Sequence, residues 1–418
     1  MSVVGLITEY NPFHNGHLYH IQEARRTTNA EAVVVVMSGN FVQRGTVAIM
    51  DKYTRTKMAM EAGADLVIEL PTCYATASAE YFAFGAVSLL EQLGFVDCLV
   101  FGSECGDIDL LKEIARLYEE EPPELSKLIQ IQLKKGISYP SARANALLDY
   151  FEGSHHPLKR QDMSFEEILN SPNNILGIEY LRALIRLNSS ICPYTITRIQ
   201  NDFHSSKLTG SISSATAIRK SLTAQDFDLT KIKDCVPSFA YSMLKKAYQT
   251  TFPIEPNDIS LLLKYKLLEL DGINLEQYLD VSKDLANRIT KSKISTHTFL
   301  ELVDEIRSKQ YTQTRIQRAL LHILLGIKKE EMEQYVAFGH PPYARILGLR
   351  KSASSYLRHV KQTDDFTVIT KLSRVNLEGV AKQMLDLDIY AAHLYNLIIA
   401  QRFHQDCKDE YTRGVILL

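Results

Sequence analysis

Apolar runs and helix-like stretches alternate over the first part of the chain, up to about residue 105. Continuous apolar strands separated by helices are typical of a parallel sheet covered on both faces. The pattern therefore predicts a doubly wound α/β domain. The predicted strands are 3–10, 32–38, 65–70 and 97–104, and the predicted helices are 17–28, 52–62 and 78–93.

The remainder of the chain reads as mostly helical. Apolar residues recur at helical spacing through much of 106–190, and a strand at 194–199 and a polar run at 204–222 then return to the sheet. From about residue 238 strand signals nearly vanish and amphipathic helical patterns dominate. We therefore expect a Rossmann-like, doubly wound α/β domain over 1–235, with a helical insertion at about 106–190, and a mainly α-helical domain over 236–418.

Composition narrows the class of protein. Hydrophobic residues make up 45% of the 418-residue chain and charged residues 23%, the proportions of a globular protein rather than a disordered one. No run approaches the ~18 apolar residues of a membrane-spanning helix, and the N-terminus lacks the basic start of a signal peptide. The six cysteines are scattered, which favours reduced thiols in the cytoplasm. The formal charge of -2 does not exclude a nucleic-acid partner, because a near-neutral total can hide a basic face.

The strongest chemical signal is the string EYNPFHNGH at 9–17, which follows the first predicted strand and opens the first helix. Ligands of open parallel sheets bind at the carboxyl ends of strands, where helix N-termini present free N–H groups. Gly16 has no Cβ, so a nucleotide could approach its backbone closely. His14 and His17 could both donate to phosphate oxygens as charge builds on a leaving pyrophosphate. An isolated H-x-x-H is more often a surface or core feature, and the position after the first strand is what favours chemistry.

A second signal is the string SISSATAIRK at 211–220. Hydroxyl groups cluster at the N-terminus of a helix that is predicted to begin near residue 214, and Arg219 and Lys220 follow on it. Hydroxyl and backbone donors with a guanidinium suit a triphosphate, although a plain helix cap with a solvated basic face is the common alternative.

Several further positions are weaker candidates for the nucleotide site. Gly102, Asn173 and Arg198 are each expected near the carboxyl edge of the sheet, against the alternatives of a turn glycine, an N-cap and a surface charge. The loop 37–45 offers polar groups for substrate contact. Lys52 and Arg55 follow it, and a solvated helix face is at least as good an interpretation for them as phosphate steering.

Together these strings resemble a known family. H-x-G-H after the first strand, with I-S-S-x-T-x-I-R after a later strand, is similar to the HIGH nucleotidylyltransferase superfamily. EYNPFHNGH, MSGNFVQRG, SPNNILGIEY and ISSATAIRK, followed by a long helical part, resemble the bacterial tRNA(Met) cytidine acetate ligases. The resemblance implies that acetate attacks the α-phosphate of ATP to give acetyl-adenylate, and that N4 of the wobble cytidine of elongator tRNA(Met) then takes the acetyl group.

The expected site residues follow from the motifs and this resemblance. The catalytic set is His14, His17, Ser213, Ser214 and Arg219. The ATP-binding set is Ile7, Thr8, Glu9, Tyr10, Asn11, Pro12, Phe13, His14, Asn15, Gly16, His17, His20, Gly102, Asn173, Arg198, Ser213 and Thr216. No protein metal site is expected, since the sequence shows no clear ligand cluster, and Mg²⁺ would arrive held by ATP and water.

The tRNA anticodon region is expected on the helical part. Arg315, Arg318 and His322 fall on one stripe beside an apolar stripe, at 315–324. A second basic cluster is interleaved with Tyr343 and Tyr356, and basic groups with aromatics suit RNA. A solvated helical face is the alternative that charge patterning alone favours. The expected RNA contacts are Arg315, Arg318, Arg350 and Lys351, and the second cluster comprises Arg345, Arg350, Lys351, Arg358, His359 and Lys361.

Three other functions are weighed against the ligase. A small-molecule adenylyltransferase acting on a phosphorylated cofactor precursor is the main alternative, although such enzymes rarely need a large helical domain. A non-catalytic RNA-binding scaffold has no need of the intact His14 and His17 pair. A class I aminoacyl-tRNA synthetase should carry a K-M-S-K-S-type loop, and we find none that is convincing.

Overall fold

The structure is a computed structural model that describes residues 2–154, 163–198, 213–224, 228–270, 273–308, 310–360 and 365–418. Residues 204–212 of the polar run and Lys361 of the second basic cluster lie outside this description. No helix in the described ranges is long and apolar enough to cross a membrane.

An eight-stranded sheet with the order β10-β8-β5-β2-β1-β6-β7 forms the centre of the molecule, and β9 pairs with β8. From β5 through β2, β1 and β6 to β7 all neighbours are parallel, whereas β8 is antiparallel to β5. The predicted α/β fold is therefore confirmed. The sheet strands are β1 (Val3–Thr8), β2 (Ala32–Ser38), β5 (Leu66–Leu70), β6 (Cys98–Ser103), β7 (Cys192–Thr197), β8 (Tyr343–Leu349), β9 (Thr367–Ile369) and β10 (Ile416–Leu417); β3 (Phe41–Val42) and β4 (Thr46–Val47) form a small hairpin.

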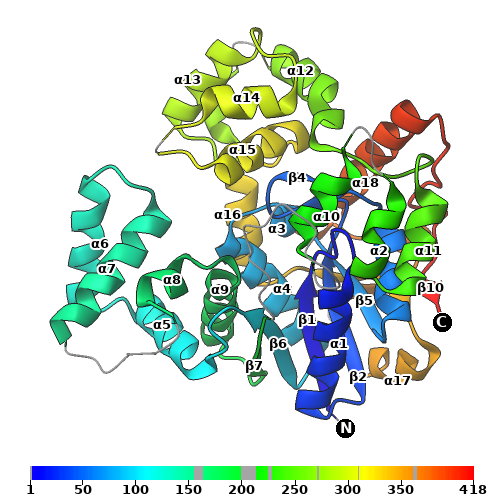
Figure 1. The fold of residues 1–418 in the computed structure, drawn as a ribbon, viewed down its shortest axis with the longest axis horizontal. Helices are drawn as coiled ribbons and strands as arrows, with labels where there is room; N and C mark the ends of the chain where they lie inside the picture. Colours follow the sequence, from blue (N-terminus) through cyan, green and yellow to red (C-terminus); the bar gives the residue numbers. More distant parts are fainter. Residues whose placement is uncertain are drawn as a thin grey trace.

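Helices make up most of the rest of the described chain (Figure 1). The α-helices are α1 (Asn15–Thr28), α2 (Lys52–Glu61), α3 (Thr72–Ala75), α4 (Ala79–Leu93), α5 (Ile108–Glu120), α6 (Pro123–Lys134), α7 (Tyr139–Ser154), α8 (Phe165–Asn170), α9 (Pro172–Arg186), α10 (Ala215–Leu222), α11 (Ser238–Ala247), α12 (Ser260–Glu269), α13 (Lys283–Ser292), α14 (Phe299–Ile306), α15 (Gln313–Leu325), α16 (Lys329–Phe338), α17 (Ser354–Leu357) and α18 (Gly379–Phe403). The 3-10 helices are η1 (Leu229–Cys235), η2 (Pro256–Ile259), η3 (Leu275–Gln277), η4 (Lys351–Ala353) and η5 (Leu372–Arg374).

The continuous apolar runs are explained by burial on both faces of the sheet. In β2, Val34 and Val36 belong to one buried cluster, and Val33, Val35 and Met37 belong to the other. Helices α4, α5 and α9 pack into the first cluster, and α1, α2 and α11 pack into the second. Successive side chains of a strand point to opposite faces, so a strand covered on both sides needs apolar residues at every position.

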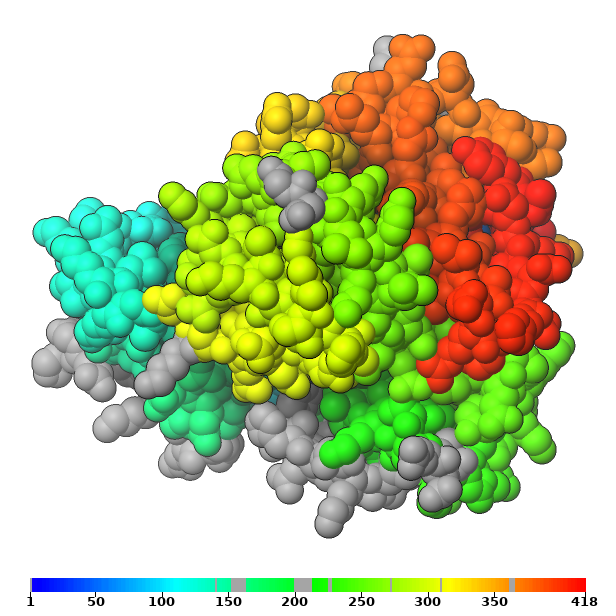
Figure 2. All heavy atoms as spheres, turned by 90° about the horizontal axis from the view of Figure 1, so that it is seen from above, coloured from blue at the N-terminus to red at the C-terminus, as the bar shows by residue number. Residues whose placement is uncertain are grey.

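Between β6 and β7 the chain forms the helices α5 to α9, and in Figure 1 α6 and α7 project away from the sheet. Helices α12 to α15 stand over the end of the sheet that lies opposite the N-terminus. From above, in Figure 2, this group (lime to yellow) covers the middle of the face, between the α5–α6 region in cyan and α18 in orange-red. The helical group is thus placed over the carboxyl edge of the parallel strands.

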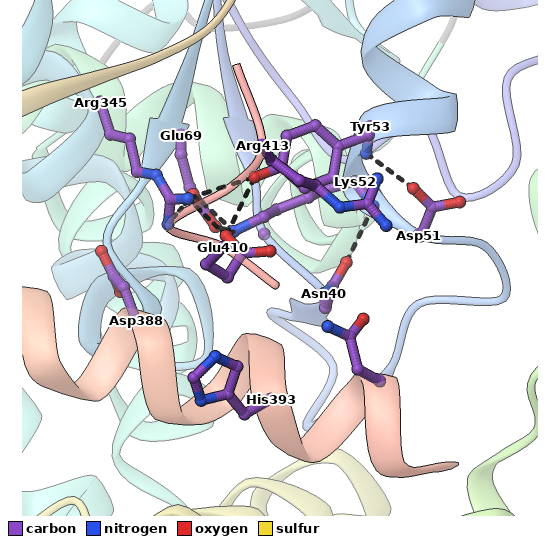
Figure 3. A network of polar contacts seen from close by, with 12 residues as sticks. Asn40, Asp51, Lys52, Tyr53, Glu69, Arg345, Asp388, His393, Glu410 and Arg413 are labelled. Atoms are coloured by element: carbon purple, nitrogen blue, oxygen red, sulfur yellow. Dashed lines mark hydrogen bonds and ion pairs between the residues drawn. The ribbon is translucent and has the colours of Figure 1, made fainter. Parts of the chain in front are cut away.

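The C-terminal half also contributes to the sheet, which the sequence pattern does not predict. Strands β8, β9 and β10 all come from after residue 340. The run YARILGL of β8 escapes prediction because it carries an arginine, which reads as a surface residue. Arg345 is 4% exposed in the structure, and its guanidinium forms ion pairs with Glu69 and Glu410 (Figure 3). The sheet therefore crosses the predicted boundary at 235, and the division into 1–235 and 236–418 stays a prediction.

Candidate active site

A cleft of about 620 Å³ opens at the carboxyl edge of the sheet, where β1, β6 and β7 end and α1, α9 and α10 begin. Strands separated widely in the sequence meet here because parallel strands end on the same edge. Most of the predicted site residues line this cleft: Ile7, Thr8, Glu9, Tyr10, Asn11, His14, Gly16, His17, His20, Gly102, Asn173, Arg198, Ser213, Ser214 and Arg219.

The two histidines of the H-x-x-H string form the N-terminal cap of α1. The Nδ1 atom of His14 accepts the N–H of Gly16 at 3.1 Å, and Nδ1 of His17 accepts the N–H of His14 at 3.3 Å. The two imidazoles stack with centroids 3.7 Å apart. A Cβ on Gly16 would lie 2.9 Å from Cε1 of His14, so the glycine makes room for this ring. The motif thus organises its own helix start as well as facing the cleft.

Burial sets the protonation state of both rings, and these hydrogen bonds set the tautomer. Burial lowers the pKa of His14 to about 3, with the charges of Arg198 and Arg219 acting in the same direction. Burial also lowers the pKa of His17 well below its ordinary value, and the neighbouring His14 adds to the effect. Both rings are therefore neutral near pH 7. Since each Nδ1 accepts a backbone N–H, each Nε2 carries the proton and is a donor.

Arginines give the cleft an excess of positive charge. Arg44, Arg198, Arg219 and Arg318 line it, and among the described residues the carboxylates that line it are Glu9 and Glu104. Burial lowers the pKa of Arg219 to about 10, with Arg44 contributing, so the guanidinium stays charged at neutral pH. Such a surface favours an anionic ligand.

The predicted helix beginning near residue 214 is confirmed as α10. Ser214 is its N-cap and accepts the N–H of Ala217 at 3.1 Å. Arg219, on the same helix, donates to the carbonyl of Asn11 and to the hydroxyl of Thr216. The two strongest motifs of the sequence are therefore joined directly by a hydrogen bond.

The weaker candidates meet at the ends of β6 and β7. Asn173 donates to Glu104 at 2.6 Å and accepts from Arg198 at 3.3 Å. A Cβ on Gly102 would lie 3.2 Å from Cγ of Arg198, so a side chain there would press on the arginine. Glu104 also accepts the N–H of Asn174 at 2.9 Å. The sequence reasoning misses Glu104, although its position at the end of a predicted strand is an available signal.

Four members of the predicted ATP set do not line the cleft. Asn15 donates to the carbonyl of Asp234 at 2.8 Å and so ties α1 to η1. Phe13 is fully buried, with its ring centroid 6.0 Å from that of Phe239. Pro12 is buried beside Phe13, and Thr216 bonds to Arg219. These four residues adjoin residues of the cleft without lining it themselves.

Neither sequence interpretation of Lys52 and Arg55 is correct, because both residues are fully buried. Nζ of Lys52 lies 2.8 Å from Glu69, which leaves it neither solvated nor facing the cleft. Arg55 donates to the carbonyls of Glu9 and Ser38 at 2.7 and 3.0 Å. It therefore acts as a brace that joins the ends of β1 and β2. In the loop 37–45, Gln43 and Arg44 do line the cleft.

The cleft also has an apolar wall that the sequence does not indicate. It is built from α4, β6 and α9, whose cleft-facing residues lie far apart in the chain. Only the folded arrangement brings them together. They are Ala79, Phe82, Phe101, Ile175, Leu176 and Tyr180.

Comparison with known proteins identifies the family. A model of the HIGH Nucleotidyl Transferase family matches residues 1–410. A tRNA(Met) cytidine acetate ligase of Acetivibrio thermocellus is 40% identical over the full length of both chains, and one of Alkaliphilus metalliredigens is 41% identical over 96% of this chain and 95% of its own. The chain belongs to the tRNA(Met) cytidine acetate ligase family of HIGH nucleotidyl transferases. The structure of Thermotoga maritima TmcAL bound with alpha-thio ATP matches with a TM-score of 0.89 and 32% identity, covering both chains completely.

The expected RNA contacts of this member of the acetate ligase family fall in two separate places. Arg315 and Arg318 lie on α15, and Arg318 lines the cleft. Arg350 follows β8, and its backbone N–H donates to the carbonyl of Asp65 at 2.8 Å, just before β5. The backbone N–H of Lys351 donates to the carbonyl of Leu418 at 3.0 Å. Because Asp65 lies at the amino end of β5 and the cleft lies at the carboxyl ends of the parallel strands, Arg350 and Lys351 lie at the opposite edge of the sheet.

The second basic cluster is not one exposed surface. Tyr343 and Arg345, which the sequence places among the RNA-facing residues, are 1% and 4% exposed within β8. Tyr343 donates to Asp388 at 2.6 Å, and Arg345 pairs with Glu69. Both residues belong to the buried framework of the sheet and cannot reach an RNA without unfolding it.

Proposed function

We propose that this chain is an ATP-dependent ligase that activates acetate as acetyl-adenylate and acetylates N4 of the wobble cytidine of elongator tRNA(Met). One observation carries the proposal. Stacked, neutral imidazoles and four arginines line a single cleft, in a chain that matches over its full length a TmcAL solved with alpha-thio ATP. The choice of acetate as the acyl donor and of tRNA(Met) as the acceptor rests on the names of the relatives.

In the first step, acetate attacks the α-phosphorus of ATP and pyrophosphate leaves. Acetate is already an anion at neutral pH, so this step needs no catalytic base. What it needs is positioning and neutralisation of the charge that builds on the leaving group. The Nε2–H groups of His14 and His17 and the guanidinium of Arg219 would supply donors for that charge, and Ser213 and Ser214 would add hydroxyl groups at the start of α10.

In the second step, the N4 amine of the cytidine attacks the acetyl carbonyl. The bond between the acetyl carbon and the phosphate oxygen breaks, AMP leaves, and the amine loses one proton. The apolar wall of the cleft, which includes Phe82 and Phe101, is where water would be kept from the reactive anhydride. The anticodon region of the tRNA would lie across the mouth of the cleft, against α15.

In this proposal Mg²⁺ enters the cleft bound to ATP. In the described ranges no group of three or more His, Cys, Asp or Glu side chains is arranged to hold a metal ion. The two carboxylates that line the cleft already accept hydrogen bonds, Glu9 from the N–H of Gln43 and Glu104 from that of Asn174. This lining fits an Mg²⁺ ion whose ligands are mainly phosphate oxygens and water molecules. We place the reaction in the cytoplasm.

The test is isotope exchange between pyrophosphate and ATP, measured without tRNA. We expect exchange that requires acetate, because acetyl-adenylate forms before RNA is needed. Exchange that instead requires a phosphorylated cofactor precursor would favour a small-molecule adenylyltransferase. No exchange under any of these conditions would favour a scaffold and overturn the proposal.

A further inference from the structure

An arginine of the helical group reaches the cleft. Arg318 lies on α15, yet it lines the cleft together with Thr314 of the same helix, and its side chain is only 13% exposed. The other three cleft arginines lie before residue 220. The helical group therefore supplies part of the site itself.

One carboxylate holds the guanidinium of Arg318. Nε donates to Oδ2 of Asp280 at 2.9 Å. Burial by itself would raise the pKa of Asp280, but the charge and hydrogen bond of Arg318, together with His322 and Arg315, outweigh it and the pKa is lowered. The Nη1 and Nη2 atoms of Arg318 make no hydrogen bond or ion pair with any other residue that the structure describes. Of the five N–H donors of a guanidinium, four are thus available, in the planar fork that matches phosphate oxygens.

Two further sets of contacts hold α15 in place, one at Gly45 and one at His322. A Cβ on Gly45, whose φ is +76°, would lie 2.3 Å from the backbone nitrogen of Arg318, so the β3–β4 turn packs directly on the helix at this point. One turn later, the buried His322 has its two ring nitrogens 3.1 Å from the carbonyls of Leu279 and Thr76. These contacts, one at the backbone of Arg318 and one a turn later, therefore fix the position of Arg318 at the cleft.

We propose that Arg318 binds a phosphate group of the substrates in the cleft and that Asp280 is its positioning residue. The inference rests on the proposed function for the identity of the substrates. A guanidinium fork recognises a phosphate oxygen, whether it belongs to ATP or to the RNA backbone beside the target cytidine. The sequence predicts Arg318 as one of several contacts on an RNA-binding surface, and this proposal places it inside the catalytic cleft.

The experiment uses the full chain and two binding measurements without acetate: calorimetry with ATP and filter binding with purified tRNA. The variants are Arg318→Gln, Arg318→Lys, Asp280→Asn and the double variant. The matched controls are Arg288→Gln and Asp284→Asn, because that Arg–Asp pair lies on α13 with side chains 41% and 53% exposed. Thermal unfolding of each variant shows whether the fold is kept.

We expect Arg318→Gln to weaken binding of ATP or of tRNA by about tenfold or more relative to Arg288→Gln, because a charge-assisted bidentate contact is lost. Weaker ATP binding assigns the phosphate to the nucleotide, and weaker tRNA binding assigns it to the RNA backbone. Arg318→Lys should be intermediate, since it keeps the charge and loses the fork. Asp280→Asn should weaken the same ligand but add nothing in the Arg318→Gln background.

If a folded Arg318→Gln variant binds both ligands within about twofold of the control, the proposal is overturned. Additive effects of the two substitutions would remove the positioning role of Asp280. Both outcomes are independent of whether acetate is the acyl donor. A failure of acetate-dependent exchange would therefore be distinguished from a failure of this proposal.

Discussion

Two clusters of charged residues in this molecule differ in the partners that their charged groups have within the protein. In the buried network of Figure 3, Lys52 and Arg345 each form ion pairs with both Glu69 and Glu410, and all four side chains are at most 5% exposed. In the cleft, Arg219 meets a carbonyl and a hydroxyl group. The first cluster is complete within the protein, whereas the second retains positive charge for a ligand.

The contrast shows what separates a structural cluster from a functional one. A buried charge without a partner is costly, so a framework residue needs fixed partners, which are carboxylates for Lys52 and Arg345 and backbone carbonyls for Arg55. A cleft open to solvent can keep its cations until an anion binds. Glu410 comes from the C-terminal tail, and it completes a network that begins at Lys52 on α2 (Figure 3). Lys52 and Glu410, which lie far apart in the chain, are thereby joined in one network of ion pairs.

The largest effect is expected from Lys52→Ala. It would leave the two buried carboxylates of Glu69 and Glu410 to share the charge of Arg345, and breaking a buried pair in this way costs about 3–5 kcal/mol. Urea unfolding measures the change. The matched control is Lys382→Ala, whose pair with Asp386 is exposed and should contribute below about 1 kcal/mol. Equal midpoints for the two variants would contradict the structural role of the network.

His17→Ala should nearly abolish pyrophosphate exchange while the fold is kept. Loss of one donor to a developing charge costs about 10²–10³ in rate, or about 2.7–4 kcal/mol. His14→Ala should behave alike, because both rings present an Nε2–H group. His393→Ala is the control, since its ring pairs with Asp409 on the surface. Exchange near the wild-type rate in either cleft variant would sink the assignment of these histidines.

Lowering the pH should remove the contribution of the Glu410 carboxylate to the free energy of unfolding. Burial alone would raise the pKa of this carboxyl, but Lys52 and Arg345 lower it from 4.5 to about 2. Between these values the unfolded chain binds the proton more readily, so stability falls as pH falls. The advantage of the wild type over Glu410→Gln should be fully present above about pH 4.5, on the order of 3 kcal/mol, and lost towards about pH 2. A pH-independent difference would show that the carboxylate charge is not what matters.

The smallest effects concern the proposed tRNA-binding surface. Arg315→Glu places a negative charge on α15 beside the cleft, and it should weaken tRNA binding by about tenfold with a shallower salt dependence. Lys351→Glu lies at the opposite edge of the sheet and should change binding by less than about twofold. Filter binding over a series of salt concentrations compares them. The reverse order would place the RNA on the other side of the molecule.

Much of the fold and of the cleft can be predicted from local sequence. The strand β2 is apolar at nearly every position because both of its faces are buried, and the H-x-x-H string follows β1 directly. Both signals are local and so can be read along the chain. His14, His17 and Arg219 are found for this reason.

The remainder depends on contacts between distant segments. Arg345 looks like a surface residue until Glu69 and Glu410 are placed beside it, and the nearer of these two in the chain is 65 positions away. The same applies to Lys52, whose nearer partner in the chain, Glu69, is 17 positions away. The charge of a residue is visible in the sequence, but the counter-ion that makes it structural is not.

The most direct test of the account is mass spectrometry of nucleosides from purified tRNA after incubation with the protein, ATP and ¹³C-labelled acetate. We expect N4-acetylcytidine that carries the label, dependent on ATP and absent with His17→Ala. Labelled acetyl-adenylate without labelled cytidine would confine the chemistry to the first step. A folded wild-type protein that yields no labelled acetylcytidine from tRNA(Met) would contradict the account.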